Sequence, residues 1–149
     1  MHIIDMRPPR IALALTLIAA VLHWSLNRGE VLRFAWLWGG VILVLAGSFM
    51  VLWSWGLFKK RNVALCPRAE TTSLLTDGPY RFTRNPMYLG FVLILAGLAL
   101  GVGTPPFYLS AIVYFLIINC VFCPYEEGKL IDSFGVEYIQ YLSRVRRWI

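Results

Sequence analysis

The sequence predicts an all-α integral membrane protein with about four transmembrane helices and cytosolic amphipathic helices at its C-terminus. Of the 149 residues, 58% are hydrophobic and only 15% are charged, and the mean hydropathy is +0.65. A soluble domain of this size does not need so much apolar surface. The length predicts one domain over residues 1–149, with an N-terminal helical pair and loop in 1–73 and a motif-bearing half in 74–149.

Three uncharged blocks define the predicted helices, since about 20 apolar residues are needed to cross a bilayer. The third block, residues 87–125, is long enough for two helices, and the sequence GVGTPP at 101–106 cannot continue a helix. The predicted helices are therefore 11–26, 36–58, 87–102 and 106–122. A short hairpin that does not cross the bilayer fully is the alternative for the last two.

The basic residues predict which end of the helices faces the cytosol. With both termini inside, 12 of the 14 Lys and Arg residues lie on the cytosolic side. This is the bias that the positive-inside rule describes. An anionic membrane surface then accounts for the net charge of +6, and no nucleic-acid partner is needed.

The C-terminal residues follow a helical pattern. Apolar and aromatic side chains recur at spacings of three and four, which indicates one or two short amphipathic helices: Leu130, Phe134, Tyr138, Tyr141, Val145 and Trp148. Gly135 is expected to interrupt them as a cap or a kink. These helices would lie against the membrane surface or against the protein core.

The segment GPYRFTRNPMYLG at 78–90 is the first candidate for chemistry and is here called the loop motif. Charges at the entrance of a membrane helix are costly unless something polar binds them. Arg81 and Arg84 would share a face if helical, so they could clamp a carboxylate or phosphate. The alternative is plain anchoring on the cytosolic side. Asn85 adds an amide donor in an extended position before Pro86, and Gly90 leaves room for a ligand or another helix.

The second candidate is the adjacent carboxylate pair Glu126 and Glu127, here called the acidic pair, which follows Pro124 at the end of an apolar block. Proline in the first turn with acids behind it is also ordinary helix-terminus chemistry. The functional alternative is that one carboxylate binds a ligand cation such as an amino group. Its companion would hold an arginine or act as a base.

Other polar residues are expected to be structural. Cys66, Cys120 and Cys123 are too few and too far from histidine for a zinc site, so packing is the expected role and no metal is predicted. His23 lies within the first helix, where a hydrogen-bonded packing role is favoured over a functional one. Five tryptophans near predicted helix ends are expected to be membrane-interface anchors: Trp36, Trp38, Trp53, Trp55 and Trp148.

Together the two candidate segments resemble the signature of the isoprenylcysteine carboxyl methyltransferase and phospholipid methyltransferase superfamily. That signature reads Gly-Pro-Tyr-Arg, a short gap, Arg-His-Pro, a variable residue, Tyr, a variable residue and Gly. A Glu-Glu pair, a Phe-Gly-x-x-Tyr-x-x-Tyr segment and a basic-aromatic end follow it. Here the later elements are the acidic pair, FGVEYIQY at 134–141 and RVRRWI at 144–149. The resemblance covers residues 74–149, about half of the chain.

The resemblance implies S-adenosylmethionine as the methyl donor, bound on the cytosolic side. Glu126 or Glu127 would hold its ammonium group, and Arg81, Arg84 and Asn85 would hold its carboxylate or organise the pocket. The adenosine would be lined by Leu75, Gly78 and Tyr80, and Tyr88 would orient the sulfonium. Among these, Arg84, Asn85 and Glu127 are the predicted catalytic residues.

Two departures from the family pattern limit the predicted chemistry. Asn85 stands where histidine is usual, and an amide cannot act as a base or become cationic near neutral pH. The chain also lacks the additional membrane helices of larger members, so a bulky prenylated peptide is not the expected substrate.

The predicted function is methyl transfer to a small lipophilic or lipid-linked acceptor, through a carboxylate, thiol or amine, at the cytosolic membrane interface. The alternatives are an NADPH-dependent membrane reductase of the sterol-reductase type and a non-catalytic membrane scaffold. The phosphates of NADPH would call for more arginine and fewer paired carboxylates near the site.

Overall fold

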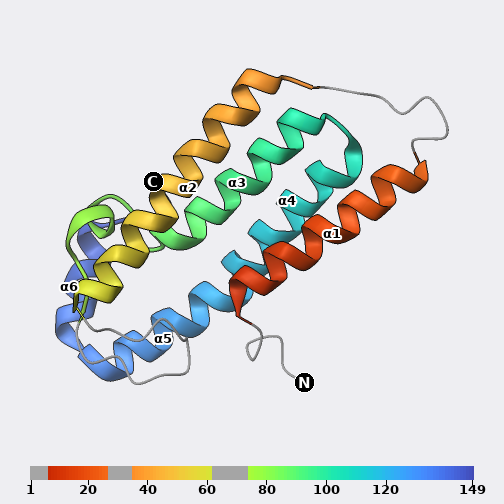
Figure 1. The fold of residues 1–149 in the computed structure, drawn as a ribbon. Helices are drawn as coiled ribbons and strands as arrows, with labels where there is room; N and C mark the ends of the chain where they lie inside the picture. The colour runs from red at the N-terminus through yellow and green to blue at the C-terminus, as the bar shows by residue number, and fades with distance from the viewer. Residues whose placement is uncertain (1–6, 27–34, 62–73) are drawn as a thin grey trace.

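A computed structural model describes residues 7–26, 35–61 and 74–149 of the chain, and within these ranges it contains helices and no strand. Figure 1 shows their arrangement. The described elements, in chain order, are α1 (Pro8–Leu26), α2 (Leu37–Arg61), the 3₁₀ helix η2 (Gly78–Arg81), α3 (Pro86–Val102), α4 (Pro105–Ile117), the π-helical segment η3 (Ile118–Phe122), α5 (Cys123–Phe134) and α6 (Val136–Arg144). The predicted all-α class is confirmed for this part of the chain.

The four apolar helices lie side by side, and α5 and α6 lie at one end of them (Figure 1). Helix α3 packs against both α2 and α4, and α1 packs mainly against α4. The loop motif and the acidic pair therefore reach the same end of the bundle, because α3 begins there and α4 runs back to it through η3.

Glycines allow α2 and α3 to approach closely. A Cβ atom added to Gly47 would lie 2.5 Å from the carbonyl oxygen of Gly90, and one added to Gly97 would lie 2.6 Å from that of Gly40. Small residues at such contacts let backbones pack directly. Of the two roles predicted for Gly90, room for another helix is the one that the structure uses.

The predicted break between the last two apolar helices is confirmed. Helix α3 ends at Val102, and Gly103 follows in the left-handed conformation with a φ of 74°. That conformation suits glycine because it has no Cβ. Helix α4 then begins at Pro105, where a missing backbone N–H costs nothing.

The predicted end of the fourth helix at residue 122 is wrong. The structure continues from Pro105 to Phe134 as one helix of 30 residues. Its π-helical segment, Ile118–Phe122, comes directly before Cys123 and Pro124. A wider π turn relieves the clash and the missing hydrogen bond that proline brings to a helix interior. Pro124 therefore does not start a separate helix.

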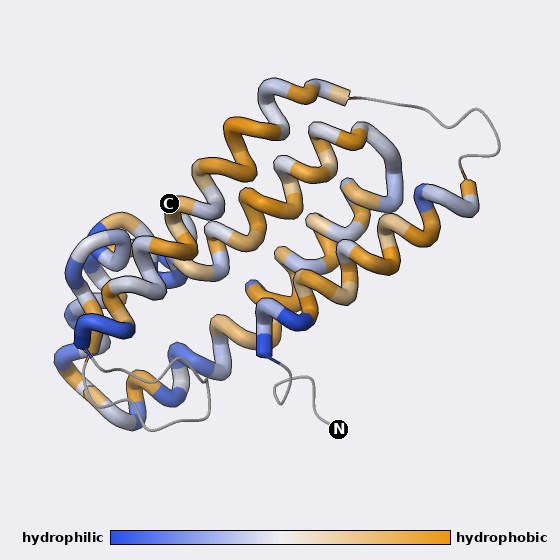
Figure 2. Tube along the Cα trace, in the orientation of Figure 1, coloured by the Kyte–Doolittle hydropathy of each residue, from blue (hydrophilic) through white to orange (hydrophobic). Residues whose placement is uncertain are grey.

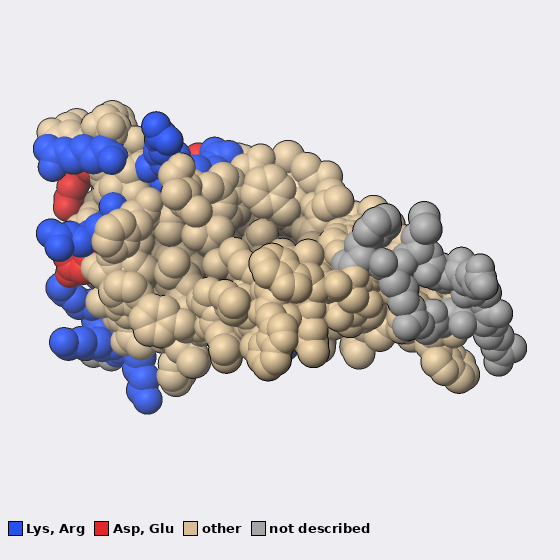
Figure 3. All heavy atoms as spheres, turned by 90° about the horizontal axis from the view of Figure 1, so that it is seen from above, with Lys and Arg blue, Asp and Glu red and all other residues tan. Residues whose placement is uncertain are grey.

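Three helices are long and apolar enough to cross a membrane: Pro8–Leu26, Leu37–Arg61 and Pro105–Phe134. The fourth apolar helix, α3, has 17 residues and is shorter. Figure 2 shows hydrophobic residues along these helices and hydrophilic residues gathered toward one end. Figure 3 shows that the Lys and Arg side chains of the described residues are concentrated at one end. A polar end on an apolar bundle is typical of a membrane protein.

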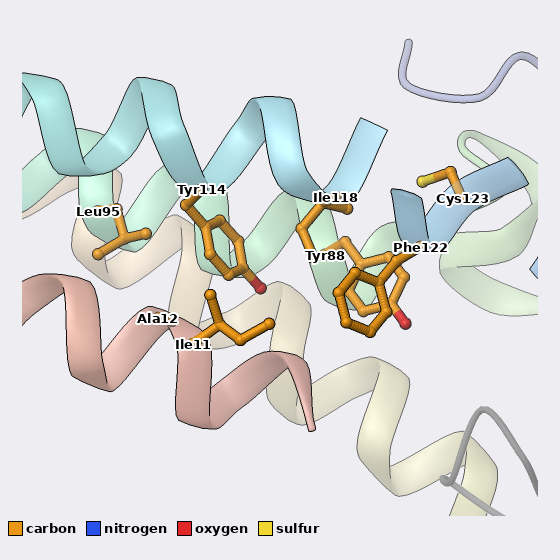
Figure 4. Packing of buried hydrophobic residues seen from close by; sticks show 8 residues of the cluster. All are labelled: Ile11, Ala12, Tyr88, Leu95, Tyr114, Ile118, Phe122 and Cys123. Atoms are coloured by element: carbon orange, nitrogen blue, oxygen red, sulfur yellow. The ribbon is translucent and has the colours of Figure 1, made fainter. Parts of the chain in front are cut away.

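A buried cluster joins α1, α3 and the long helix (Figure 4). It consists of Ile11, Ala12, Tyr88, Leu95, Tyr114, Ile118, Phe122 and Cys123. Cys123 is buried, as the packing prediction requires, whereas Cys120 is exposed; Cys66 lies outside the described residues.

The packing role predicted for His23 is confirmed by its contacts. Its Nδ1 atom lies 3.1 Å from the hydroxyl of Thr104 in a hydrogen bond. Its ring also meets Phe107 edge to face at 6.0 Å. The histidine thus ties α1 to the start of α4, at the end of the bundle opposite to the acidic pair.

The C-terminal helices follow the predicted pattern. Gly135, with a φ of 52°, separates α5 from α6. On α6, Tyr138 and Tyr141 are buried, while Val136 and Ile139 are exposed. The amphipathic tail is therefore confirmed, and its aromatic face packs against the protein.

Candidate active site

The first part of the loop motif forms a turn beside the end of α2. Gly78 adopts a φ of 57° and opens η2, in which Pro79 and Tyr80 are buried. The Tyr80 ring lies edge to face with Phe58 at 6.0 Å. Leu75 is half-buried just before this turn. The three residues predicted to line the adenosine, Leu75, Gly78 and Tyr80, thus lie on one short segment.

Tyr141 of α6 holds this turn in place. The hydroxyl of Tyr141 donates a hydrogen bond of 2.6 Å to the carbonyl of Tyr80. Burial raises the pKa of Tyr141, and burial likewise raises the pKa of Tyr138 to about 12. Both phenols therefore stay neutral near pH 7, so Tyr141 remains a donor to the turn.

The second part of the loop motif binds the last residues of the chain. The Thr83 hydroxyl donates to the Arg147 carbonyl at 2.8 Å, and the Asn85 side-chain amide donates to the same oxygen at 3.4 Å. The Arg84 backbone N–H donates to the Arg146 carbonyl at 3.0 Å. The C-terminal segment, residues 145–149, is thereby held against the entrance of α3.

Asn85 is not helical, as predicted, but with φ −129° and ψ 54° its backbone is not extended either, so that part of the prediction is wrong. Its backbone N–H donates to the Thr83 hydroxyl at 3.2 Å, so both its amides serve the local structure. A histidine would bring a titratable ring to this position. Asparagine instead supplies a fixed donor at the junction between loop and helix.

Glu127 lies between two arginines. Arg147 meets it in a bidentate pair, with Nε 2.9 Å from Oε1 and Nη2 2.5 Å from Oε2. Arg84 adds a contact of 3.1 Å from Nη1 to Oε1. The Arg84 and Glu127 side chains are only 14% and 16% exposed, so water screens this pair weakly. The hydrogen bond to Glu127 raises the pKa of Arg147.

Asn119, in the π-helical segment, anchors the C-terminal segment from the other side. Its side-chain oxygen accepts from the Trp148 indole N–H at 3.0 Å and from Arg147 Nη1 at 3.3 Å. Its backbone carbonyl lies 3.4 Å from the same Nη1. A π turn frees a backbone carbonyl from the regular helical ladder, which suits this contact.

Glu126, the other half of the acidic pair, faces a different partner. It accepts a hydrogen bond of 2.5 Å from the Tyr88 hydroxyl, on the first turn of α3. The Tyr88 ring packs near Phe122 at 6.5 Å. The acidic pair is therefore divided, with Glu127 bound to arginines and Glu126 bound to a neutral hydroxyl.

The structure separates the two arginines that the sequence suggested as a clamp. Arg81 is exposed at the end of η2, whereas Arg84 is mostly buried against Glu127. In the described part of the chain, the buried Arg84 Nε has no hydrogen-bond partner. Arg84 therefore keeps one unused donor beside the acidic pair.

Sequence reasoning missed four residues of this arrangement: Thr83, Asn119, Arg147 and Trp148. The sequence predicts an interface anchor at Trp148, but in the structure its indole N–H is bound to Asn119 and its ring lies 5.1 Å from that of Phe115. The basic-aromatic end of the sequence was visible as a pattern. Its contact partners lie 20 to 64 residues away in the chain, and spacing does not reveal them.

The fold and this site define a class: a small helical membrane protein with a buried carboxylate–arginine site at the polar end of its helices. Comparison with known proteins adds the family. Residues 35–137 match the model of the phospholipid methyltransferase family, and the chain belongs to that family. The resemblance seen in the loop motif and the acidic pair is thereby confirmed.

Similar curated proteins include several named methyltransferases. Protein-S-isoprenylcysteine O-methyltransferase B of Arabidopsis thaliana is 35% identical over 81 residues, which are 52% of this chain and 40% of that protein. Methanethiol S-methyltransferase 1 of Bradyrhizobium diazoefficiens is 37% identical over 108 residues, 71% of this chain and 37% of that protein. These names support an enzyme of the membrane methyltransferase type.

The chain thus spans about two fifths of the length of these relatives. The Schizosaccharomyces pombe protein-S-isoprenylcysteine O-methyltransferase shows the same proportion, at 29% identity over 56% of this chain and 36% of its own length. No solved structure is significantly similar to the chain.

Proposed function

We propose that the chain transfers a methyl group from S-adenosylmethionine to a small lipophilic or lipid-linked acceptor at the cytosolic membrane interface. Family membership and the methyltransferase names of its relatives support this reaction type. The observation that carries the proposal is the divided acidic pair. The Glu127 carboxylate is neutralised by two arginines. The Glu126 carboxylate is bound by the Tyr88 hydroxyl, so it can still accept a hydrogen bond from a cation.

The residues at the site fit the polar end of this donor. Glu126 has one carboxylate oxygen bound to Tyr88, so its remaining acceptor capacity suits the methionine ammonium. The unpartnered Arg84 Nε suits the methionine carboxylate. This pairing assigns the ammonium to Glu126 rather than Glu127. Arg84 would then bind both Glu127 and the methionine carboxylate.

The remaining site residues have supporting roles in the proposal. Glu127 fixes the guanidinium of Arg84, and Asn85 fixes the loop entrance through the Arg147 carbonyl. Leu75, Gly78 and Tyr80 line the adenosine, and Tyr88 orients the sulfonium end. Arg81, being exposed, would contribute charge at the mouth of the site rather than a buried contact.

When bound, S-adenosylmethionine supplies a methyl group on a positively charged sulfur, and little acid–base help is then required. The protein's tasks are to align the two reactants and to exclude water. Asn85 cannot act as a base, and this is compatible with a transfer that needs no base at that position.

The same proposal includes the topology. Four helices would cross or enter the bilayer with both termini in the cytosol, which places the basic end in Figure 3 at the cytosolic surface. With 17 residues, α3 is about 26 Å long at about 1.5 Å per residue. That is close to the hydrocarbon thickness of about 30 Å, so α3 can cross with little tilt.

Calorimetric titration of S-adenosylhomocysteine into the detergent-purified protein tests the donor, with NADPH as the control. Binding of S-adenosylhomocysteine without an NADPH response is expected. Binding of NADPH alone would favour the alternative function of an NADPH-dependent membrane reductase. Absence of both, in protein shown to be folded by circular dichroism, would favour the scaffold alternative.

A further inference from the structure

The hydroxyl of Tyr114 is buried and unused. Tyr114 lies on α4 with 0% of its surface exposed, and no group in the described part of the chain forms a hydrogen bond with its hydroxyl. Burying an unpaired hydroxyl costs free energy that a phenylalanine at the same position would avoid. The hydroxyl therefore needs an explanation outside the fold.

Its position links it to the proposed active site. Tyr114 belongs to the same buried cluster as Tyr88 and Cys123 (Figure 4). Tyr88 already donates to Glu126, so within this cluster Tyr114 is the phenol whose proton has no acceptor.

The surroundings of the Tyr114 ring are apolar. Figure 4 shows the ring reaching from α4 toward Ile11 and Ala12 on α1. Phe91 meets it edge to face at 6.4 Å. Leu15 on α1 and Val92 on α3 pack against the same cluster. A ligand bound to the Tyr114 hydroxyl would therefore have a hydrocarbon body.

We propose that the Tyr114 hydroxyl donates a hydrogen bond to the nucleophilic atom of the methyl acceptor, and that this acceptor is a thiolate or a carboxylate. The inference rests on the proposed function, which places the donor's ammonium at Glu126. Tyr114 then lies deeper in the apolar core than the donor's charged end, on the side of α1.

The lone pairs of the acceptor decide its class. A neutral amine has one lone pair, and a hydrogen bond from Tyr114 would occupy the pair that must attack the methyl group. A thiolate or a carboxylate oxygen keeps further lone pairs for the attack. The hydrogen bond also compensates an anion for the water that it loses in an apolar site.

The transfer step balances without a proton. A lone pair on the acceptor's sulfur or oxygen forms a bond to the methyl carbon. The bond from that carbon to the sulfonium breaks, and its electron pair stays on the donor's sulfur. The anion and the cation become two neutral products, a thioether or ester and S-adenosylhomocysteine.

The experiment compares the wild type with Tyr114→Phe, using Tyr108→Phe as the matched control. Tyr108 lies on the same helix but packs against the second apolar cluster, near Phe107. Hexanethiol, hexanoate and hexylamine are titrated into each protein saturated with S-adenosylhomocysteine, at a pH where part of the thiol is ionised. Thermal unfolding of all three proteins is measured alongside.

The expected result is that the wild type binds hexanethiol or hexanoate more tightly than hexylamine. Tyr114→Phe should bind that anion about tenfold more weakly or worse, as for hydrogen bonds to charged groups. Its unfolding midpoint should equal or exceed that of the wild type, and Tyr108→Phe should bind like the wild type. In turnover, the loss should fall on the acceptor KM rather than on kcat, because the bond weakens as the charge disappears.

Unchanged anion binding by Tyr114→Phe would overturn the inference, as would tighter binding of hexylamine. A lower unfolding midpoint would show that the hydroxyl has a partner within the protein, which also overturns it. If the wild type binds S-adenosylhomocysteine but none of the three probes, the acceptor assignment alone fails. If S-adenosylhomocysteine itself does not bind, the proposed function fails first.

Discussion

The Arg147 guanidinium and the Glu127 carboxylate face each other in a bidentate pair, with Nε and Nη2 on the two oxygens at 2.9 Å and 2.5 Å. This pair joins the end of the chain to the helix that carries the acidic pair. Since Arg84 shares the same carboxylate, the loop motif, the long helix and the C-terminal segment are joined through Glu127.

Arg147→Gln should weaken both folding and donor binding. The change removes two charge-assisted hydrogen bonds from a partly buried site, so we expect a loss of about 1–3 kcal/mol in the free energy of unfolding. Arg84 should lose its fixed position, and S-adenosylhomocysteine affinity should fall about tenfold. Calorimetry and unfolding measurements check both effects. The matched control is Arg146→Gln, because Arg146 contributes its backbone carbonyl and its side chain is exposed. Equal losses in the two variants would argue against a specific role for Arg147.

The two carboxylates of the acidic pair should differ when each is replaced by its amide. Glu126→Gln should abolish S-adenosylhomocysteine binding while unfolding stays near that of the wild type, since Tyr88 can still donate to the amide oxygen. Glu127→Gln should lower the unfolding midpoint, because two arginines lose their counter-charge. Titration and thermal scans of both variants separate the two roles. Binding like that of the wild type in both would show that the site is assigned to the wrong residues.

Gly47→Ala should destabilise the contact between α2 and α3. The new Cβ would lie 2.5 Å from the Gly90 carbonyl oxygen and 2.9 Å from Ile94, so the helices must separate. Overpacking of this kind costs about 1–3 kcal/mol. Gly56→Ala on the same helix meets no atom within 4 Å and should be neutral or stabilising, by up to about 1 kcal/mol from helix propensity. Unfolding in detergent, followed by circular dichroism, compares the two variants, and a larger loss of stability in Gly56→Ala would contradict close packing of α2 on α3.

High pH should unfold the protein through its buried phenols. In the folded state, burial raises the pKa of Tyr138 to about 12 from its usual value of 10.0, and it raises the pKa of Tyr141 as well. A raised folded pKa means that stability is fully present below pH about 10 and is lost as the pH climbs through the folded value. Unfolding midpoints should therefore fall between pH 10 and 12. The double variant Tyr138→Phe/Tyr141→Phe should start lower, because the bond to the Tyr80 carbonyl is gone, and show a shallower fall. If the unfolding midpoint of the double variant fell as steeply with pH as that of the wild type, groups other than Tyr138 and Tyr141 would be responsible for the loss of stability.

Most helix positions follow from composition and local backbone chemistry. Glycine and two prolines at 101–106 break the last apolar block for local reasons, and the structure breaks there. The continuation through Pro124 could not be predicted in this way, because proline within a helix depends on the π turn before it. That turn accompanies contacts from Arg147 and Trp148 to Asn119, which are remote in sequence.

The sequence by itself determined the all-helical class, the breaks between helices, the polar end and the two segments that carry the family resemblance. These depend on local periodicity, on charge placement and on residue types with fixed backbone preferences. Only the tertiary structure decided which carboxylate meets the arginines and that Arg84 rather than Arg81 is buried with them. It also decided that the Tyr114 hydroxyl has no hydrogen-bond partner among the residues that the structure describes. Side-chain pairing across a bundle depends on helix rotation and chain-end docking, and many remote contacts set these jointly.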